Sequence, residues 1–306
     1  RNEDAELFKL AIGGYGLFGI IATVTLRLVP RQKVQRQVEL VTADQAMAKF
    51  AERVAGGFIY GDWQLSTDPD SEGFLNEGLL SCYRPVDAGT PMDESRKPAD
   101  EAEWRNLIYL AHTDRKKAWQ IRKDKALAAS GAVDWSDRQQ QAVYVDNYHR
   151  DIDTQMGASV PASEMTSELY LPRDKLVAFL AEIRDDFRQN AVGLIDGTVR
   201  LIEQDDETFL AWARQPWACF SCNLHVVHDD VGLAKAGDDI RHLIDRALKY
   251  GGSFGLAYHR WASRGEVEAG YPAFADFLRL KRQYDPEERF QSDWYRRYRA
   301  LFTLAG

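Results

Sequence analysis

The stretch TSELYLPRDKLVAFLAEIRDDFRQNAVGLIDGTVRLI, Thr166 to Ile202, decides the fold class of this chain. It opens with a short strand pattern, and Pro172 then suits the first turn of a helix. Apolar residues at helical spacing follow, and Leu194 to Ile202 reads as a second strand. The expected buried helical face consists of Leu176, Phe179, Leu180, Ile183 and Phe187. The stretch therefore predicts a β-α-β unit.

The chain after this stretch extends the pattern. Trp217 to Val227 reads as a strand, Asp238 to Tyr250 as a helix and Phe254 to His259 as a last strand. The order β-α-β-β-α-β is that of the ferredoxin-like unit, and Val34 to Tyr83 looks like a partial β-α-β-β repeat of it. We expect an α+β fold in which two such units share one antiparallel sheet. Helices would lie on one face, leaving the other face free for a site.

Three further segments carry expectations. LFGIIATVTLRLV, Leu17 to Val29, alternates from Thr23 onward and predicts a strand that Pro30 ends. Glu101 to Ala129 has strong helical propensity. Ser130 to Ala162 is polar with little periodicity, and it reads either as an irregular loop over a site or as a plain connection.

Composition excludes several classes of function. The 306 residues carry a net charge of −8, so a nucleic-acid surface with clustered Lys and Arg is not expected. No apolar run reaches the ~18 residues of a membrane span. Three cysteines are too few for a disulfide scaffold, which favours the cytoplasm. We expect a small, uncharged or weakly polar substrate, while the oligomeric state stays open and a homo-oligomer is allowed.

Two spacings that resemble metal or redox motifs are not interpreted as such. Cys219 and Cys222 form C-x-x-C within an apolar run rather than at the start of a helix. His225 and His228 fall on opposite strand faces by alternation, so they do not share a metal ion. No metal site is expected.

A glycine-rich run matches a nucleotide-binding pattern, but the segment that follows it is not the helix that such a site requires. Gly14-Tyr15-Gly16-Leu17-Phe18-Gly19 matches G-x-G-x-x-G. A dinucleotide turn of that kind opens a helix, whereas a β-branched, alternating segment follows here. The glycines then serve either as a simple tight turn or as backbone that a planar ligand can approach without Cβ interference.

Both ends of the chain resemble one enzyme superfamily. ELFKLAIGGYGLFGIIATVTLRLVP, Glu6 to Pro30, resembles the segment that closes the FAD-binding domain in the FAD-linked oxidases of the vanillyl-alcohol oxidase and p-cresol methylhydroxylase superfamily. Tyr271 to Tyr298 is similar to its terminal helix ending in K-x-x-x-D-P-x-x-x-F. The matching residues there are Lys281, Asp285, Pro286 and Phe290. The resemblance implies that FAD is the cofactor. It also implies that the stretch running past the flavin contacts it through Gly13, Gly14, Gly16, Gly19 and Ile20.

Between the ends the resemblance is closest to the sugar-oxidising branch, meaning aldonolactone and alditol oxidases and decaprenylphosphoryl-ribose oxidase. SELYLPRD from Ser167, TVRLI from Thr198 and NLHVV from Asn223 resemble stretches of that branch. The resemblance implies a division into residues 1–33, the edge of the FAD-binding domain, residues 34–265, a substrate-side cap domain, and residues 266–306, a segment that returns to the FAD domain.

Candidate catalytic residues follow from alternation and resemblance together. Strand alternation places Glu168, Arg200 and His225 on polar stripes, where a solvated face is the alternative reading. His225, or else Tyr258 or His259, would act as general base because imidazole titrates near neutral pH. Arg200 would stabilise a developing alkoxide or the reduced, anionic flavin. AYHRWAS, from Ala257, lacks the lysine that the sugar-oxidising relatives carry near the flavin.

The implied activity is oxidation of an alcohol CH–OH of a sugar-like or other hydroxy substrate by hydride transfer to flavin. A non-catalytic ferredoxin-like binding or regulatory module is the alternative. The family's pyrophosphate contacts lie before the glycine run, so we expect the 306-residue chain alone to be colourless and inactive. Its first ~30 residues would then pack as an orphaned strand or two.

Overall fold

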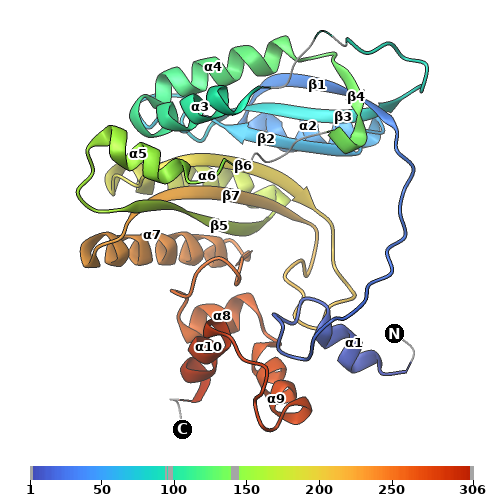
Figure 1. Ribbon diagram of the computed structural model, residues 1–306, viewed down its shortest axis with the longest axis vertical. Coiled ribbons are helices and arrows are strands. Elements are labelled where there is room, and N and C mark those ends of the chain that lie inside the picture. Colours follow the sequence, from blue (N-terminus) through green and yellow to red (C-terminus); the bar gives the residue numbers. More distant parts are fainter. Residues whose placement is uncertain (1–2, 94, 96–98, 139–144, 304–306) are drawn as a thin grey trace.

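A computed structural model describes residues 3–93, 95, 99–138 and 145–303. The upper part in Figure 1 is a sheet covered by helices, and the lower part gathers both ends of the chain. The strands are β1 (Lys33–Thr42), β2 (Tyr60–Leu65), β3 (Glu77–Val86), β4 (Val133–Trp135), β5 (Ala162–Pro172), β6 (Leu194–Ile202), β7 (Trp217–Val227) and β8 (Ser253–Phe254). The α-helices are α1 (Ala5–Ala11), α2 (Ala43–Ala55), α3 (Glu101–Thr113), α4 (Arg115–Ala128), α5 (Tyr148–Met156), α6 (Leu176–Gln189), α7 (Asp230–Lys249), α8 (Arg264–Gly270), α9 (Phe274–Tyr284) and α10 (Asp293–Thr303).

The strands form one antiparallel sheet in the order β4-β1-β3-β2-β6-β7-β5-β8. Strands β5 to β8 have the ferredoxin-like arrangement, with β5 and β7 side by side at the centre of their half. Strands β1 to β4 repeat this arrangement, with β1 and β3 at the centre. The halves join where β2 pairs with β6, through Trp63 opposite Val199 and Gln64 opposite Thr198. The expected α+β class with ferredoxin-like units is confirmed.

The main core lies between the sheet and helices α2, α6 and α7. Residues of alternate strand positions, such as Trp63 and Phe220, face these helices and are completely buried. Because strand side chains alternate between faces, their neighbours in sequence point to the other side of the sheet. That other face carries most of the polar strand residues.

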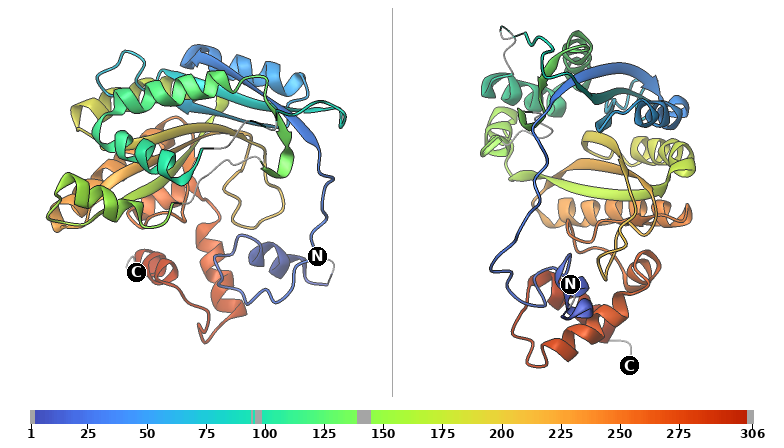
Figure 2. Two further views of the ribbon diagram at one scale, coloured as in Figure 1. Left: turned by 45° about the horizontal axis from the view of Figure 1, so that its top comes forward. Right: turned by 90° about the vertical axis from the view of Figure 1, so that its right-hand side faces the viewer.

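Helices also cover part of the polar face, which corrects the expectation that helices lie on one face only. Figure 2 shows α3, α4 and α5 on the side of the sheet opposite α2 and α6. Arg122 of α4 donates to Asp196 of β6 at 2.7 Å, and His112 of α3 contacts Glu164 of β5 at 3.2 Å. Only the remainder of the polar face is open to a ligand.

Both ends of the chain pack together below the sheet. Leu10 and Leu17 are buried in a cluster with residues of α9 and α10. Phe18 contacts Phe277 edge to face. The loop of residues 203–216, between β6 and β7, descends to this unit in Figure 1, and the Phe209 N–H donates to the Lys9 carbonyl at 3.0 Å.

The strand predicted over Leu17 to Val29 is not formed. From Gly19 to Val29 the chain pairs with no strand that the structure describes, and the apolar side chains from Ile20 onward are exposed, whereas Leu17 is buried. The most exposed are Ile20 (85%), Leu28 (84%) and Val29 (82%). The alternation is real, but a strand needs a hydrogen-bonding neighbour, and the described part of the chain offers this segment none.

Other boundaries also differ from the expected ones. The helix expected from Asp238 to Tyr250 begins eight residues earlier, as α7, because the Asp229 carboxylate accepts from the Gly232 N–H and starts the helix there. The single helix over Glu101 to Ala129 is two helices, because Asp114 leaves helical geometry and its carboxylate accepts from the Lys117 N–H, starting α4. The last strand, expected from Phe254 to His259, is only Ser253–Phe254. The stretch from Ser130 to Ala162 contains β4 and α5, while its residues 139–144 lie outside the described part of the chain.

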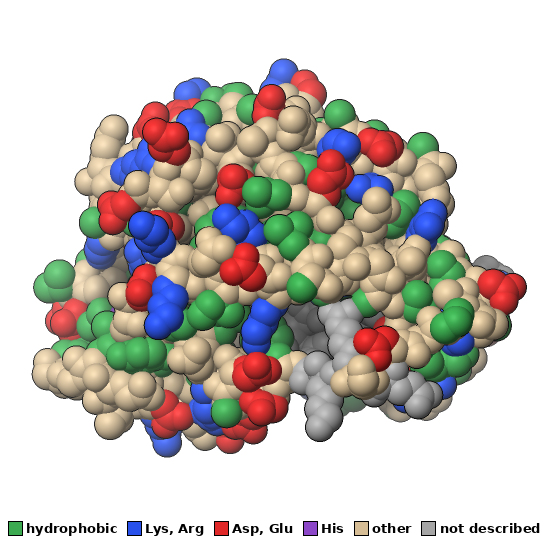
Figure 3. All heavy atoms as spheres, turned by 90° about the horizontal axis from the view of Figure 1, so that it is seen from above, with side chains coloured by type: hydrophobic (Ala, Val, Ile, Leu, Met, Phe, Trp, Pro, Cys, Tyr) green, Lys and Arg blue, Asp and Glu red, His purple; other side chains and the backbone are tan. Residues whose placement is uncertain are grey.

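The surface seen from above in Figure 3 mixes acidic and basic side chains, and neither sign gathers into a continuous patch on this face. Among the described helices, none combines the length and apolarity that crossing a membrane requires.

Candidate functional site

The polar face of the sheet carries a row of side chains from neighbouring strands. Arg200 of β6 lies opposite Cys219 of β7, and Cys219 lies opposite Tyr170 of β5. On the other side of Arg200, continuing the register of β2 and β6 by one pair places Asp62 beside it. Directly opposed residues have Cβ atoms ~5 Å apart, so these side chains are immediate neighbours.

Arg200 and Glu168 form the central contact of this face. Arg200 Nη2 donates to Glu168 Oε1 at 2.6 Å, and the Tyr170 hydroxyl donates to Glu168 Oε2 at 2.9 Å. Glu168 is mostly buried (12% exposed), whereas 42% of the Arg200 side chain is exposed. The pair therefore holds the guanidinium in place, while part of the Arg200 side chain stays open to a ligand.

Tyr258 lies beside this pair in the turn after β8. Burial, followed by the neighbouring Glu168 carboxylate, raises the pKa of Tyr258. The phenol therefore stays protonated at neutral pH and can donate a hydrogen bond. The structure thus brings together three of the residues expected from sequence, Arg200, Glu168 and Tyr258.

Asp62 is a site residue that the sequence interpretation missed. Burial raises its pKa to about 6, with Asp196 adding to the rise and Arg36, Arg200 and Arg122 opposing it. The available signal was the strand YGDWQL, in which alternation puts Asp62 on the same face as Tyr60 and Gln64. A carboxyl group in the middle of a strand, beside apolar neighbours, indicates a polar site on that face.

His225 lies in a different part of the polar face. From Cys219 to His225, β7 runs about 20 Å at ~3.3 Å per residue. The His225 ring meets the His112 ring of α3 edge to face, at 5.4 Å between centroids, and Glu164 is its partner on β5. Burial, then the His112 charge, lowers the pKa of His225. His225 therefore does not adjoin Arg200.

His259 points away from the polar face. Its Nε2 lies 3.4 Å from the Ser167 hydroxyl, and Ser167 is completely buried on the core side of β5. The ring stacks on Trp261. Burial lowers the pKa of His259 to about 4, so the imidazole is neutral at pH 7.

In the glycine run, the backbone of the preceding helix comes so close that one position must be glycine. A Cβ on Gly14 would lie 1.9 Å from the Leu10 carbonyl oxygen, so only glycine fits there. Gly16 has φ of +71° and Gly19 of +142°, and a Cβ on either would meet open space. Gly13 lies against Thr208 of the β6–β7 loop, and Ile20 is exposed. The run thus serves as a tight turn and also leaves open backbone on one side.

A chain of contacts connects this turn to the Arg200 pair. Tyr15 stacks on Trp294 of α10, with centroids 4.2 Å apart and rings 8° from parallel. The Trp294 indole N–H donates to the Leu256 carbonyl at 2.8 Å, and Leu256 belongs to the turn that carries Tyr258. The predicted flavin-contacting glycines and the Arg200, Glu168 and Tyr258 cluster are therefore parts of one connected region.

The described residues fit the ring side of a flavin. Open backbone at Gly16 and Gly19 allows a planar ring to approach closely, and the exposed Ile20 could cover its edge. A bound flavin would supply a hydride acceptor at this place.

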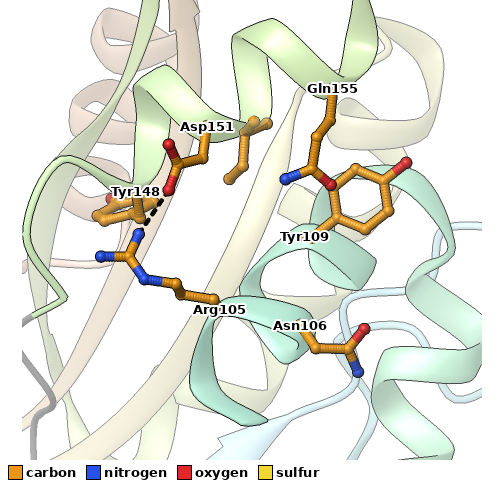
Figure 4. A pocket seen from close by; sticks show the side chains of 7 residues that line it. Arg105, Asn106, Tyr109, Tyr148, Asp151 and Gln155 are labelled. Carbon is orange, nitrogen blue, oxygen red and sulfur yellow. Dashed lines mark hydrogen bonds and ion pairs between the residues drawn. The ribbon is translucent and has the colours of Figure 1, made fainter. Parts of the chain in front are cut away.

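A separate pocket of about 210 Å³ lies between α3 and α5 (Figure 4). In it Arg105 is paired with Asp151 at 2.6 Å. Tyr148, on the pocket wall, shares a hydrogen bond with Glu164, so the pocket adjoins the His225 cluster rather than Arg200. The lining residues are Arg105, Asn106, Tyr109, Tyr148, Asp151, Ile152 and Gln155.

In the described part of the chain, no three or more His, Cys, Asp or Glu side chains lie close enough together to hold a metal ion. Cys82, Cys219 and Cys222 are buried and unpaired. Cys219 faces the polar side of β7 and Cys222 faces the core, so the two thiols of the C-x-x-C spacing point apart.

Comparison with known proteins gives one informative result. No family model matches the sequence, and no curated protein matches it either. Among solved structures, the chain is similar to a solvent-stable cholesterol oxidase, with a TM-score of 0.54 and 13% sequence identity. The match covers 88% of this chain and 60% of that one, so the chain spans about 60% of the length of the structure that it resembles. At this identity the likeness establishes the fold alone.

Proposed function

We propose that this chain is the substrate-side part of an FAD-dependent oxidoreductase that oxidises an alcohol CH–OH to a carbonyl. The observation that carries the proposal is the contact chain from the glycine turn through Tyr15 and Trp294 to Tyr258. It joins the segment that resembles a flavin-contacting stretch to a cluster of polar side chains suited to hold a hydroxyl. The structural likeness to a cholesterol oxidase supports an oxidase in general.

The residues of the polar face have distinct roles in this proposal. The Arg200 side chain is partly exposed, and its guanidinium binds the substrate oxygen and stabilises negative charge that develops on it. Glu168, held by Arg200 and Tyr170, fixes the direction of that guanidinium. Tyr258 donates a hydrogen bond to a second oxygen of the substrate. We propose a sugar-like or other hydroxy compound as substrate, bound between the glycine turn and the sheet.

The test uses the full-length protein loaded with FAD and mixed without oxygen with a panel of alcohols. The panel contains alditols, aldonolactones and a 3-hydroxysterol, and the readout is loss of flavin absorbance near 450 nm. We expect at least one class to bleach the flavin in wild-type protein. Arg200→Gln is expected to slow bleaching by about 100-fold, as for loss of one charge-stabilising donor.

The matched control is Arg241→Gln on α7, whose guanidinium pairs with the exposed Asp238 of the same helix, and this variant should leave bleaching unchanged. If no alcohol bleaches the flavin, the alternative of a non-catalytic ferredoxin-like module is favoured. Equal rates in the Arg200 variant and wild type would show that the polar face takes no part in the reaction.

A further inference from the structure

Asp62 differs from the other carboxylates of the polar face in having no bonded partner among the described residues. Arg36 donates to the Ser81 hydroxyl at 2.8 Å, Arg122 to Asp196 and Arg200 to Glu168. Asp62 itself makes no hydrogen bond or ion pair with any residue that the structure describes. A carboxyl group placed among three arginines but bonded to none has its hydrogen-bonding capacity free for a ligand.

The position of Asp62 is fixed by the sheet rather than by a mobile loop. It pairs with Ser81 of β3 on one side, and the β2–β6 register places Arg200 on the other. Its sequence neighbour Trp63 is completely buried in the core on the opposite face. A group carried by a central strand in this way keeps its geometry when substrate binds.

The surroundings of the Asp62 carboxyl raise its pKa into the range that suits a general base. Although part of its surface is open, most of its environment is protein, and this burial raises its pKa to about 6. A group with such a pKa is mostly ionised at pH 7 and can still accept a proton readily, which is the condition for a general base. Glu168, by contrast, is occupied by Arg200 and Tyr170.

We propose that Asp62 is the catalytic base of the polar face, accepting the hydroxyl proton of a substrate whose oxygen is held by Arg200. This inference rests on the proposed function. The substrate O–H bond breaks and its proton goes to the Asp62 carboxylate. The C–H hydrogen leaves with its electron pair to the flavin, and the remaining O–H electron pair forms the second C–O bond. The substrate is oxidised to a carbonyl and the flavin is reduced.

The first test needs no substrate. Aspartate labelled with ¹³C at the carboxyl carbon is incorporated into the chain, and the Asp62 signal is assigned by its loss in Asp62→Asn. We expect a titration midpoint near pH 6, which Arg200→Gln moves upward because the guanidinium favours the ionised carboxylate. The exposed Asp185→Asn serves as control and leaves the Asp62 midpoint unchanged. A midpoint near the ordinary value of about 4 overturns the proposal.

The second test follows flavin bleaching by an active alcohol as a function of pH. In wild-type protein the rate should rise as pH increases through about 6, because only the ionised carboxylate accepts the proton. Asp62→Asn should lower the rate by about 100-fold or more and remove this rise, while Asp62→Glu retains it. Bleaching of wild-type protein together with an unchanged rate and pH profile in Asp62→Asn overturns the role of Asp62 alone. Failure of every alcohol to bleach wild-type protein overturns the proposed function and this inference with it.

Discussion

Tyr15 and Trp294 come from opposite ends of the chain and stack almost parallel, with ring centroids 4.2 Å apart. Tyr15 has φ of +53°, a conformation that costs energy for a residue other than glycine. The stack offsets this strain and holds the glycine turn against α10. Through the indole N–H it also holds the turn that carries Tyr258.

Replacing Trp294 should loosen both turns at once. We expect Trp294→Ala to destabilise the protein by about 3 kcal/mol, since it removes the stacked ring and leaves the Leu256 carbonyl unpaired. Trp294→Phe keeps a ring and should lose only about 1 kcal/mol for the hydrogen bond. Denaturant unfolding measures both. Equal losses in the two variants would show that the stack contributes nothing.

The buried Lys281 and Asp285 pair predicts an acid-sensitive contribution to stability. Lys281 is completely buried and bonded to Asp285. The Lys281 ammonium, followed by the backbone N–H groups of Phe290 and Arg289, outweighs burial and lowers the Asp285 pKa from 3.8 to about 2. A carboxyl whose pKa is lowered on folding stabilises the protein above pH 3.8, and this contribution is lost as the pH falls towards 2.

Asp285→Asn should therefore be clearly less stable than wild type at pH 7, with the difference shrinking between about pH 4 and pH 2. The control is Asp276→Asn, whose pair with Arg279 is exposed and contributes little. Thermal unfolding across this pH range gives the comparison. A difference that stays constant with pH would contradict the ion-pair explanation.

His259 predicts a second pH dependence in a different range. Burial lowers its pKa from 6.5 to about 4, so the unfolded chain binds more protons at this residue than the folded one between these values. Stability should therefore decrease as the pH falls from about 6.5 to about 4, by up to about 1.4 kcal/mol per pH unit. His259→Gln should flatten this part of the profile, and the exposed His242→Gln should not. An unchanged slope in His259→Gln would show that the imidazole is protonated in the folded protein.

Arg200 and His225 can be distinguished by turnover. The sequence makes both of them candidate catalytic residues, but the ~20 Å from Cys219 to His225 along β7 prevents one substrate hydroxyl from contacting both. We expect Arg200→Gln to lose about 100-fold in flavin reduction and His225→Gln to stay within tenfold. A large loss in His225→Gln with little loss in Arg200→Gln would indicate that the reaction takes place at the cluster of His225, His112 and Glu164.

The sequence determined most of the architecture, because strand alternation and helical periodicity are local properties. The helical face from Leu176 to Phe187 and the strands Leu194 to Ile202 and Trp217 to Val227 were predicted with correct or nearly correct limits. The order of these elements also identified the ferredoxin-like unit. Alternation likewise put Glu168 and Arg200 on polar stripes, which the structure places in contact.

The tertiary structure alone decided those features that depend on contacts between segments distant in the sequence. Alternation over Leu17 to Val29 could not reveal that no strand in the described residues pairs with it, since hydrogen bonding between strands is not a local property. The same limit applies to the site. The register between β2 and β6 places Asp62 beside Arg200, and the length of β7 separates His225 from it. Residue type and spacing specify which face a side chain occupies, whereas the pairing of distant strands specifies its neighbours, and these neighbours set the pKa of Asp62.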